Sequence, residues 1–273
     1  MPTAPNLTWV LETEVFPDCH EALAEAAKAA GQDVVPWDDL WWSSDAWPRF
    51  ADRPVVFHGS LGNADRVRSS LSWTPGAYCN TEAFCCSNWY PQVSDDLLNR
   101  RHLFTTVRRL CEDPAGHFES LNCDDTVFVR PDSALKPFSG RVLGREQITP
   151  KALDHGFYYD DLDLPILLAP LQPVRLEWRL VMLDQQAIAG SRYEAESRSA
   201  RDTGVPEEVR RHAEELARRI DVGDRVYVMD ICRIDDGLRL LELNPFSGAD
   251  LYHCDRHRIV EALGRITKPN DES

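Results

Sequence analysis

The chain has 273 residues, a hydrophobic fraction of 43% and a formal net charge of -15, from 30 basic and 45 acidic residues. A chain of this length buries roughly three quarters of its unfolded surface, enough for one large domain or two small ones. Its negative charge opposes binding to nucleic acid and to anionic membranes, and no apolar run approaches the roughly 20 residues of a membrane span. We therefore expect a globular protein that binds neither nucleic acid nor membrane.

The eight cysteines are scattered along the chain and include no CxxC pair. This spacing disfavours both a disulfide framework and a zinc site. The N-terminus also lacks the basic region and apolar core of a signal peptide. These features predict a cytoplasmic protein with reduced thiols, while the sequence carries no information on oligomeric state.

The first hundred residues have the pattern of a small α/β unit. Residues 7–11, 33–37 and 54–57 are strand-like, and the helical segment 18–31 between the first two has an apolar face and ends at a glycine. Strands that alternate with helices predict parallel pairing in a βαβ arrangement. The glycine-containing segment 58–63 precedes another helix, and we interpret it either as a tight turn, the commoner role, or as a phosphate-binding loop.

Residues 73–91 are irregular and rich in Trp, Tyr, Cys and Asn, and we interpret them as a connector whose role the sequence does not reveal. We place the domain boundary after it, giving domains 1–92 and 93–273. A helix is expected over residues 94–111. Beyond residue 126 the pattern changes to strands, at 126–130, 165–169, 177–183, 187–190, 226–231 and 238–245, with one helix at 206–220. The second domain is therefore predicted to be α+β with a largely antiparallel sheet.

Two apolar strands near the C-terminus carry three side chains with oxygen atoms. Asp230 lies on the first, Glu242 and Asn244 lie on the second, and residues 234–237 between them predict a hairpin turn. Because residues two apart on a strand point to one face, Glu242 and Asn244 project together. Two carboxylates and an amide oxygen suit Mg²⁺, or Mn²⁺, with a bound polyphosphate. The alternative is a set of polar residues on the wet face of the hairpin, but an acid flanked by leucines is an unusual surface residue.

Four basic residues precede these oxygens, on predicted strands or at the edges of loops: Arg130, Lys136, Arg179 and Arg192. A magnesium triphosphate needs fixed positive charge, which arginine supplies as a fork and lysine as a point charge. Each residue alone would be interpreted as one partner of a surface ion pair. Their occurrence in the region that also carries the carboxylates favours a nucleotide site.

The ordered set Arg130, Lys136-Pro-Phe-Ser-Gly140, Glu177-Trp-Arg179, Arg192-Tyr193, Asp230 and Glu242-Leu-Asn244 resembles the ATP-grasp superfamily. Within it, the chain is most similar to the clade named for its two arginines and one lysine. The resemblance covers roughly residues 95–265, and the preceding βαβ unit resembles the small domain that precedes the grasp in such proteins. It implies an α+β ATP-grasp fold, with antiparallel sheets and helices, behind a small α/β pre-grasp domain.

The resemblance also implies a role for each residue of the set. The nucleotide would be bound by Arg130, Lys136, Ser139, Gly140, Ala169, Leu171 and Glu177. Of these, Lys136 would lie against the α- and β-phosphates with Arg130 nearby, and Glu177 would bind the ribose. The segment from Ala169 to Leu171 would be the linker that reads the adenine edge, although Pro170 stands where many members place an acid.

The remaining members of the set are implied to act on the reacting groups. Arg179 and Arg192 would face the γ-phosphate and the acyl-phosphate that it becomes. Asp230, Glu242 and Asn244 would be the metal ligands that bridge the phosphates. No general base is identified, and the Ser139-Gly140 loop would close over the phosphates and exclude water.

The implied function is an ATP- and Mg²⁺-dependent ligase that activates a carboxylate as an acyl-phosphate for attack by an amine. Its substrates would be small-molecule or peptide carboxylates and amines, whose identity the sequence does not give. One alternative is a nucleotide-binding or scaffold protein without catalytic activity. A metal-dependent nuclease is the less favoured alternative, because Asn244 stands where a catalytic lysine is expected and the net charge of -15 opposes a DNA substrate.

Overall fold

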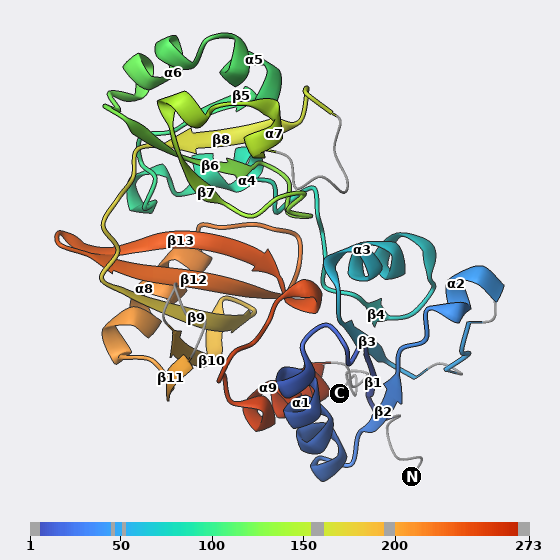
Figure 1. The fold of residues 1–273 in the computed structure, drawn as a ribbon. Helices are drawn as coiled ribbons and strands as arrows, with labels where there is room; N and C mark the ends of the chain where they lie inside the picture. The colour runs from blue at the N-terminus through green and yellow to red at the C-terminus, as the bar shows by residue number, and fades with distance from the viewer. Residues whose placement is uncertain (1–5, 45–46, 51–52, 154–160, 194–199, 267–273) are drawn as a thin grey trace.

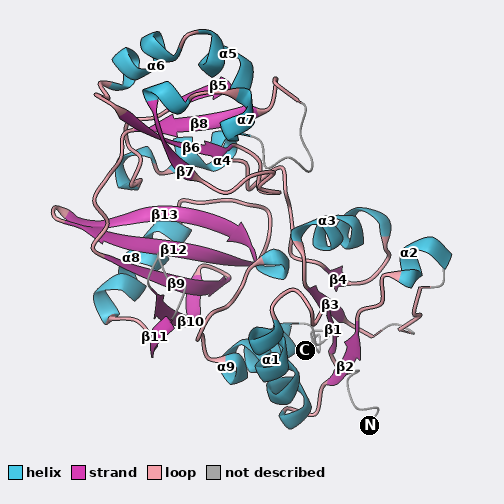
Figure 2. Ribbon diagram, viewed as in Figure 1, coloured by secondary structure: helices cyan, strands magenta, loops and turns pink. Residues whose placement is uncertain are grey.

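The computed structural model describes residues 6–44, 47–50, 53–153, 161–193 and 200–266. The prediction about a signal peptide rests partly on residues 1–5, which lie outside the described residues. Strands of the described part form one mainly parallel sheet and two antiparallel sheets (Figures 1 and 2). This arrangement confirms the predicted α+β fold preceded by a smaller α/β unit.

The N-terminal unit contains a four-stranded sheet in the order β2-β1-β3-β4. Its elements are β1 (Thr8–Leu11), α1 (Pro17–Ala29), β2 (Asp33–Pro36), α2 (Leu40–Ser44), β3 (Val55–His58), α3 (Leu61–Ser70) and β4 (Pro75–Gly76). Strand β1 pairs in parallel with both β2 and β3, as the βαβ pattern predicts. The apolar face of α1, with Leu23 and Ala27, is buried in the same core as Val56 of β3.

The turn after β3 is closed by a carboxylate. The backbone amide and the hydroxyl of Ser60 both donate to Glu12 Oε2, at 2.7 and 2.8 Å, and Asn63 donates to Glu12 Oε1. Ser60 is also the N-cap of α3. The start of this helix therefore binds a side chain of the chain itself, which favours the tight-turn interpretation of residues 58–63.

The next region is a four-stranded antiparallel sheet in the order β5-β8-β6-β7. It contains α4 (Cys86–Trp89), β5 (Leu103–Thr106), α5 (Val107–Glu112), α6 (Pro114–Leu121), β6 (Thr126–Pro131), β7 (Arg141–Gly144), α7 (Pro150–Leu153) and β8 (Pro165–Ala169). Helices α5, α6 and α7 cover one face, where Leu110 and Phe118 pack with Val129 and Leu168. The other face points toward the next sheet.

The third sheet has five antiparallel strands in the order β11-β10-β9-β12-β13. Its elements are β9 (Leu176–Leu183), β10 (Gln186–Tyr193), β11 (Ala200–Thr203), α8 (Glu207–Ala217), β12 (Val226–Ile234) and β13 (Gly237–Pro245), followed by α9 (Arg256–Ile266). The hairpin turn between β12 and β13 is confirmed, because Ile234 pairs with Gly237. Gly237 has a φ of +132°, which glycine adopts without steric conflict.

The predicted helix over residues 94–111 is wrong. The structure has a short 3₁₀ turn at Ser94–Asp96, then strand β5, and only afterwards α5. Leu97 is buried beside β13, where it bridges Leu240, and Phe104, expected in a helix core, is 42% exposed on β5. Leu103-Phe-Thr-Thr106 is rich in β-formers, and its pairing with β8 outweighs the helical spacing of the apolar residues.

The connector 73–91 contributes to the core. Phe84, Trp89 and Tyr90 are almost completely buried in the cluster that also contains Trp178 and Met229 of the five-stranded sheet. This segment is therefore packed under the sheet, and its aromatic residues supply apolar contact area.

The C-terminal helix returns to the N-terminal unit. Ile259 and Leu263 of α9 pack in one cluster with Leu23 of α1 and with Val181 and Val228 of the five-stranded sheet. Ser247, in the segment between β13 and α9, adds three hydrogen bonds. Its carbonyl accepts from the backbone amide of Gly59, its hydroxyl accepts from the backbone amide of Tyr78, and its own amide donates to the carbonyl of Tyr78. The boundary after residue 92 stays a prediction.

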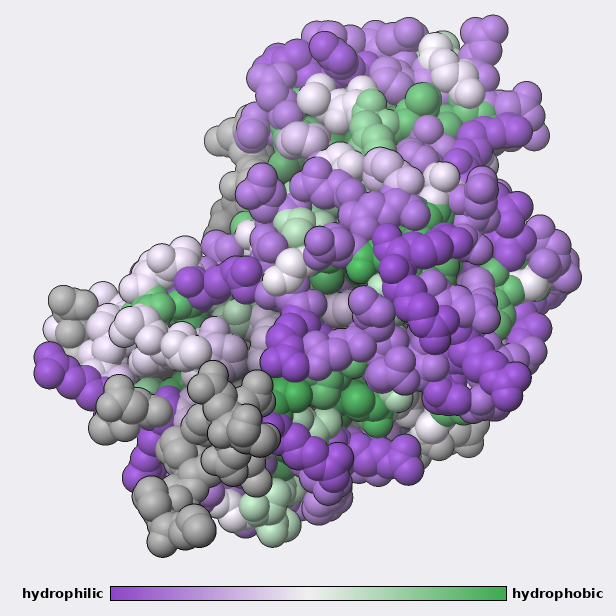
Figure 3. Space-filling view, turned by 180° about the vertical axis from the view of Figure 1, so that it is seen from behind, coloured by the Kyte–Doolittle hydropathy of each residue, from purple (hydrophilic) through white to green (hydrophobic). Residues whose placement is uncertain are grey.

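No helix among the described residues combines the length and the apolar character that crossing a membrane requires. The face in Figure 3 is mainly hydrophilic, with hydrophobic residues in separate patches.

We predict that the contact between α3 and the 246–248 turn depends on Gly248. A Cβ at this position would lie 2.3 Å from Leu61 Cδ2 and 3.1 Å from Leu61 Cα, so Gly248→Ala should destabilise the protein by about 1–3 kcal/mol. Gly62→Ala is the matched control, because its Cβ would have no neighbour within 4 Å, and it should be neutral or stabilising by up to about 1 kcal/mol. Urea unfolding measures both. Equal stability of the two variants would contradict the prediction.

Candidate functional site

Four polar side chains form a row across the five-stranded sheet. Ser191 in β10 lies opposite Arg179 in β9, Arg179 lies opposite Asp230 in β12, and Asp230 lies opposite Glu242 in β13. Directly opposite residues of antiparallel strands project to the same face. A β-bulge after Asp230 leaves Leu241 without a directly opposite residue and thereby brings Glu242 to this face. The sheet thus assembles residues from four strands into one polar line.

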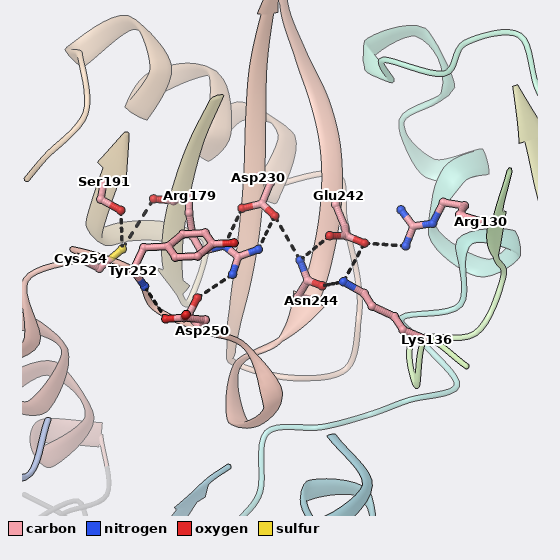
Figure 4. A network of polar contacts seen from close by, with 10 residues as sticks. All are labelled: Arg130, Lys136, Arg179, Ser191, Asp230, Glu242, Asn244, Asp250, Tyr252 and Cys254. Carbon is pink, nitrogen blue, oxygen red and sulfur yellow. Dashed lines mark hydrogen bonds and ion pairs between the residues drawn. The ribbon is translucent and has the colours of Figure 1, made fainter. Parts of the chain in front are cut away.

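The centre of the row is a buried ion pair. Arg179 Nε and Nη2 donate to the two carboxylate oxygens of Asp230 at 2.9 and 2.7 Å, and Arg179 Nη1 donates to the carbonyl of Asp250 at 2.6 Å (Figure 4). Asp230 is 1% exposed and Arg179 is 7% exposed. A buried charge pair needs good geometry and additional hydrogen bonds to offset the loss of hydration, and here the two-point contact, the Asp250 carbonyl and the Asn244 amide supply them.

Asn244 links this pair to a second cluster. Its side-chain nitrogen lies 3.3 Å from Asp230 Oδ2 and 3.1 Å from Glu242 Oε2. Glu242 Oε1 accepts from Arg130 at 2.6 Å and pairs with Lys136 at 3.0 Å, and Lys136 also donates to Asn244 Oδ1 at 2.7 Å. Figure 4 shows the continuous line of contacts from Arg179 to Arg130. The structure therefore joins the three predicted metal ligands and three of the four predicted cations in one network.

The two cations keep Glu242 ionised. Burial by itself would raise the pKa of this carboxyl, but the ammonium of Lys136 and the guanidinium of Arg130 hold the pKa well below its ordinary value. Arg130 is itself buried. Glu242 is therefore a fixed negative charge at the junction of the two sheets.

A cavity of about 490 Å³ opens between the two antiparallel sheets next to this cluster. Residues that line it come from the segment before β5, from β6 and the loop after it, and from β7, the 170–174 linker, β9 and β13. The lining includes Leu98, Asn99, Phe128, Arg130, Lys136, Phe138, Ser139, Gly140, Val142, Pro170, Leu171, Gln172, Val174, Glu177, Leu241 and Glu242. Of the predicted nucleotide-binding residues, all but Ala169 line this cavity.

The loop after β6 presents Lys136 and Gly140 to the cavity. Lys136 has a φ of +50°, a conformation that is uncommon for residues other than glycine, and its backbone amide donates to the carbonyl of Ser133. A Cβ on Gly140 would lie 2.8 Å from Phe128 Cζ, so only glycine lets the loop approach β6 this closely. Backbone geometry, and not the side chains alone, sets the position of the lysine.

Glu177 lines the same cavity from β9. Burial raises the pKa of Glu177, although a hydrogen bond with Tyr193 acts in the opposite direction. A carboxylate that is partly buried at a cavity wall and held by a tyrosine hydroxyl is a fixed hydrogen-bond acceptor.

Two predicted residues lie apart from the others. Ala169 is fully buried in the core under the sheet, so its backbone alone could contribute to a linker contact. Arg192 pairs with Trp178 in the register of β10 and β9, one residue beyond the pair of Ser191 with Arg179. Because side chains alternate along a strand, Arg192 projects to the opposite face of the sheet from Arg179.

The oxygen atoms of Asp230, Glu242 and Asn244 fit a hard divalent cation. Two of the three groups are carboxylates and the third is an amide, and the amide nitrogen donates to both carboxylates, so the three side chains lie together. In the described part of the chain, no group of three His, Cys, Asp or Glu side chains converges on one point, so a bound ion would need Asn244 as well. The Lys136 ammonium already bridges Glu242 and Asn244, which shows that these oxygens attract positive charge.

Sequence reasoning missed the segment that covers Arg179. Asp250 supplies a backbone acceptor for its guanidinium, and the ring of Tyr252 lies 4.4 Å from its central carbon. This segment lies a few residues after β13, which ends at Pro245. Its closeness in sequence to the predicted ligand Asn244 was the available signal. It also missed Asn99, a buried amide at the cavity wall.

A family model matches residues 104–262, more than half of the chain, and it describes family 2 of the ATP-grasp clade named for two arginines and one lysine. The chain belongs to this ATP-grasp family. The membership confirms the resemblance seen in the sequence and the predicted fold. The roles of the individual site residues in this ATP-grasp chain stay predictions.

Solved structures of ATP-grasp proteins share the fold along nearly the whole chain. D-cycloserine synthetase DcsG is 15% identical, with a TM-score of 0.64 over 96% of this chain and 99% of that one. The ligase PsnB, solved with a phosphomimetic variant of its minimal precursor, Mg and ADP, is 17% identical, with a TM-score of 0.61 over 97% and 99%. The macrocyclase MdnC, bound with precursor peptide MdnA from Microcystis aeruginosa MRC, is 13% identical, with a TM-score of 0.56 over 94% and 98%. A search of curated proteins gave no match.

We predict that Lys136 controls the ionisation of Glu242. Lys136→Met should raise the pKa of Glu242, because one of its two neighbouring cations is lost. A depressed carboxyl pKa stabilises the fold above the unfolded pKa, roughly 4.3, and this contribution disappears as the pH falls through the folded pKa. The variant should therefore lose the contribution of Glu242 at a higher pH than the wild type.

Carboxyl ¹³C NMR of Glu242, together with urea unfolding between pH 6 and 3, measures this shift. Lys151→Met is the matched control, since Lys151 is exposed on α7 outside the cluster. An identical Glu242 pKa in the two variants would contradict the prediction.

Proposed function

We propose that this protein is an ATP- and Mg²⁺-dependent ligase that activates a carboxylate as an acyl-phosphate and joins it to an amine. The observation that carries the proposal is the cavity between the two sheets, which ends at a cluster of three cations and two carboxylates. Mg²⁺ is the expected ion, with Mn²⁺ as an alternative.

The lining of the cavity combines two kinds of surface. Phe128, Phe138, Val142 and Leu171 contribute apolar area that suits a nucleobase. Arg130 and Lys136 contribute cationic side chains that suit phosphate oxygens. Glu177 would accept a hydrogen bond from a ribose hydroxyl. An ATP molecule would match this combination of surfaces.

The metal would be held by Asp230, Glu242 and Asn244. When bound, Mg²⁺ neutralises charge on the phosphates and on the phosphoryl group in transfer. Lys136 and Arg130 would then contact phosphate oxygens as well as Glu242. Arg179, fixed between Asp230 and the 250–252 segment, has N–H groups left to donate toward the γ-phosphate.

The reaction has two steps in which bonds and charges balance. A substrate carboxylate oxygen attacks the γ-phosphorus of ATP, so an acyl-phosphate forms and ADP leaves. The amine then attacks the acyl carbon, an amide bond forms, inorganic phosphate leaves, and the amine gives up a proton. The first step brings two anions together and the second releases an anionic phosphate, so positive charge fixed before the reaction is the contribution expected from Arg130, Lys136 and Arg179.

The proposal specifies the reaction but includes more than one class of substrate. PsnB and MdnC were solved with precursor peptides, and DcsG is named for a small-molecule product. We therefore include peptide and small-molecule carboxylates and amines in the proposal. The cytoplasmic location expected from the sequence is also part of the proposal.

The first test is nucleotide binding. ATP with Mg²⁺ at about 100 times its Kd should stabilise the protein by about 2.7 kcal/mol and raise Tm by on the order of 5 °C. Thermal shift measurements should show this increase for the wild type and Lys151→Met, and a much smaller one for Lys136→Met and Asp230→Asn. No shift for the wild type would refute nucleotide binding.

The second test separates the ligase from its alternatives. With a panel of carboxylates and amines, including peptides, the nucleotide product should be ADP with one equivalent of inorganic phosphate, as measured by ³¹P NMR. AMP with pyrophosphate would exclude the acyl-phosphate route. Tight ATP binding without turnover of any acid and amine would favour the inactive nucleotide-binding protein.

A further inference from the structure

Several groups hold Arg179, and two of them belong to one short segment. Asp230 accepts from Nε and Nη2, and the carbonyl of Asp250 accepts from Nη1. The ring of Tyr252 lies 4.4 Å from the guanidinium carbon, closer than the ring of Tyr193 at 5.9 Å. Arginine stacks on aromatic rings through its planar guanidinium, and the interaction strengthens when both groups are shielded from water. The guanidinium is therefore fixed both in its plane and across it (Figure 4).

The segment that carries Tyr252 is itself fixed by local geometry. Tyr252 has a φ of +47°, an uncommon conformation for a bulky residue, which persists only where surrounding contacts determine it. Its backbone amide donates to the side chain of Asp250 at 2.9 Å. Its ring also lies 4.9 Å from the ring of Tyr193, which hydrogen-bonds Glu177 at the cavity wall.

A buried arginine supports the same segment from below. Arg256 is 8% exposed at the start of α9, and its guanidinium donates to the carbonyls of Leu251, Tyr252 and Cys254. These three acceptors come from one turn of backbone, so Arg256 fixes its course. The Cys254 thiol adds a contact with the carbonyl of Arg179.

We propose that Tyr252 is a positioning residue whose ring holds the Arg179 guanidinium in the orientation that meets the γ-phosphate. This inference rests on the proposed function, because the phosphate contact of Arg179 belongs to it. The ring covers one face of the guanidinium and leaves the free N–H edges as the way to reach an anion. Loss of the ring leaves the pair with Asp230 intact and allows the guanidinium to tilt.

The chemical consequence is selective for the third phosphate. Disorder of Arg179 weakens the binding of a ligand that carries a γ-phosphate and leaves the binding of a ligand that ends at the β-phosphate unchanged. A purely structural role of Tyr252 would weaken both ligands together, because the whole site would be distorted.

Tyr252→Asn removes the ring and tolerates the left-handed backbone, whereas Tyr252→Phe keeps the ring and serves as the matched control. The first readout is the ¹⁵N NMR signal of Arg179 Nε–H, assigned by its absence in Arg179→Lys, and it needs no nucleotide. We expect a sharp signal in the wild type and Tyr252→Phe, and a broadened or missing one in Tyr252→Asn. An unchanged signal in Tyr252→Asn overturns the proposal.

The second readout is calorimetric affinity for AMPPNP and for ADP, each with Mg²⁺. Tyr252→Asn should lower the affinity for AMPPNP roughly 5- to 30-fold, the range of a shielded cation–π contact, and change the affinity for ADP by less than about twofold. In an Arg179→Lys background, Tyr252→Asn should have no further effect on AMPPNP. Equal losses for the two nucleotides overturn the proposal.

The design separates this inference from the proposed function. If the wild type binds neither nucleotide, the proposed function fails, and the Nε–H signal still decides whether Tyr252 orders Arg179. Tyr252→Leu is the second variant if Tyr252→Asn does not fold, and urea unfolding identifies that case. A sharp Nε–H signal in every ring-free variant that folds would refute the positioning role.

Discussion

The buried pair of Arg179 and Asp230 is the interaction on which the remaining geometry of the site depends. Two charges removed from water need good geometry and additional hydrogen bonds to offset the loss of hydration, and removal of one partner leaves an uncompensated buried charge. The pair therefore forces its surroundings to supply acceptors and donors. Asp250 and Asn244 provide them, so the loop after β13 and the end of β13 are both held by the same two residues.

The site concentrates cations in an acidic protein. The chain has a net charge of -15, yet the cluster contains Arg130, Lys136 and Arg179 against the carboxylates Asp230 and Glu242, and Glu177 at the cavity wall brings the local balance to neutral. Charges in a partly buried cavity act at short range, where solvent screens them least. Under the proposed function, these fixed cations would offset part of the charge of the polyphosphate.

The two antiparallel sheets supply different side chains to the site. The sheet with β6 supplies Arg130 and, through its following loop, Lys136, whereas the sheet with β9, β12 and β13 supplies the carboxylates. The cation-to-carboxylate contacts with Glu242 are therefore also contacts between the sheets. A ligand that fills the cavity would bind to both, so nucleotide binding and the relative position of the two sheets should be coupled.

Features that depend on neighbouring residues of the chain were predictable from the sequence. The shared face of Glu242 and Asn244, the turn at residues 234–237 and the parallel βαβ unit follow from strand period and turn chemistry, which are local properties. The helix expected over 94–111 failed for the same reason: helical spacing is local, and the pairing of Leu103–Thr106 with β8 is not. Buried aromatic residues of the connector likewise gave no local sign of the core they enter.

Only the tertiary structure decided which predicted residues meet. The bulge after Asp230 brings Glu242 to the same face, and the register of β10 sends Arg192 to the other, because a shift of one residue reverses every side chain of a strand. The ring of Tyr252 reaches Arg179 from a segment that is distant along the chain and has no motif of its own. The sequence by itself determined which side chains are available and their chemistry. The strand register and the course of the chain after β13 determined which of them meet in the site, because both depend on contacts between residues far apart in sequence.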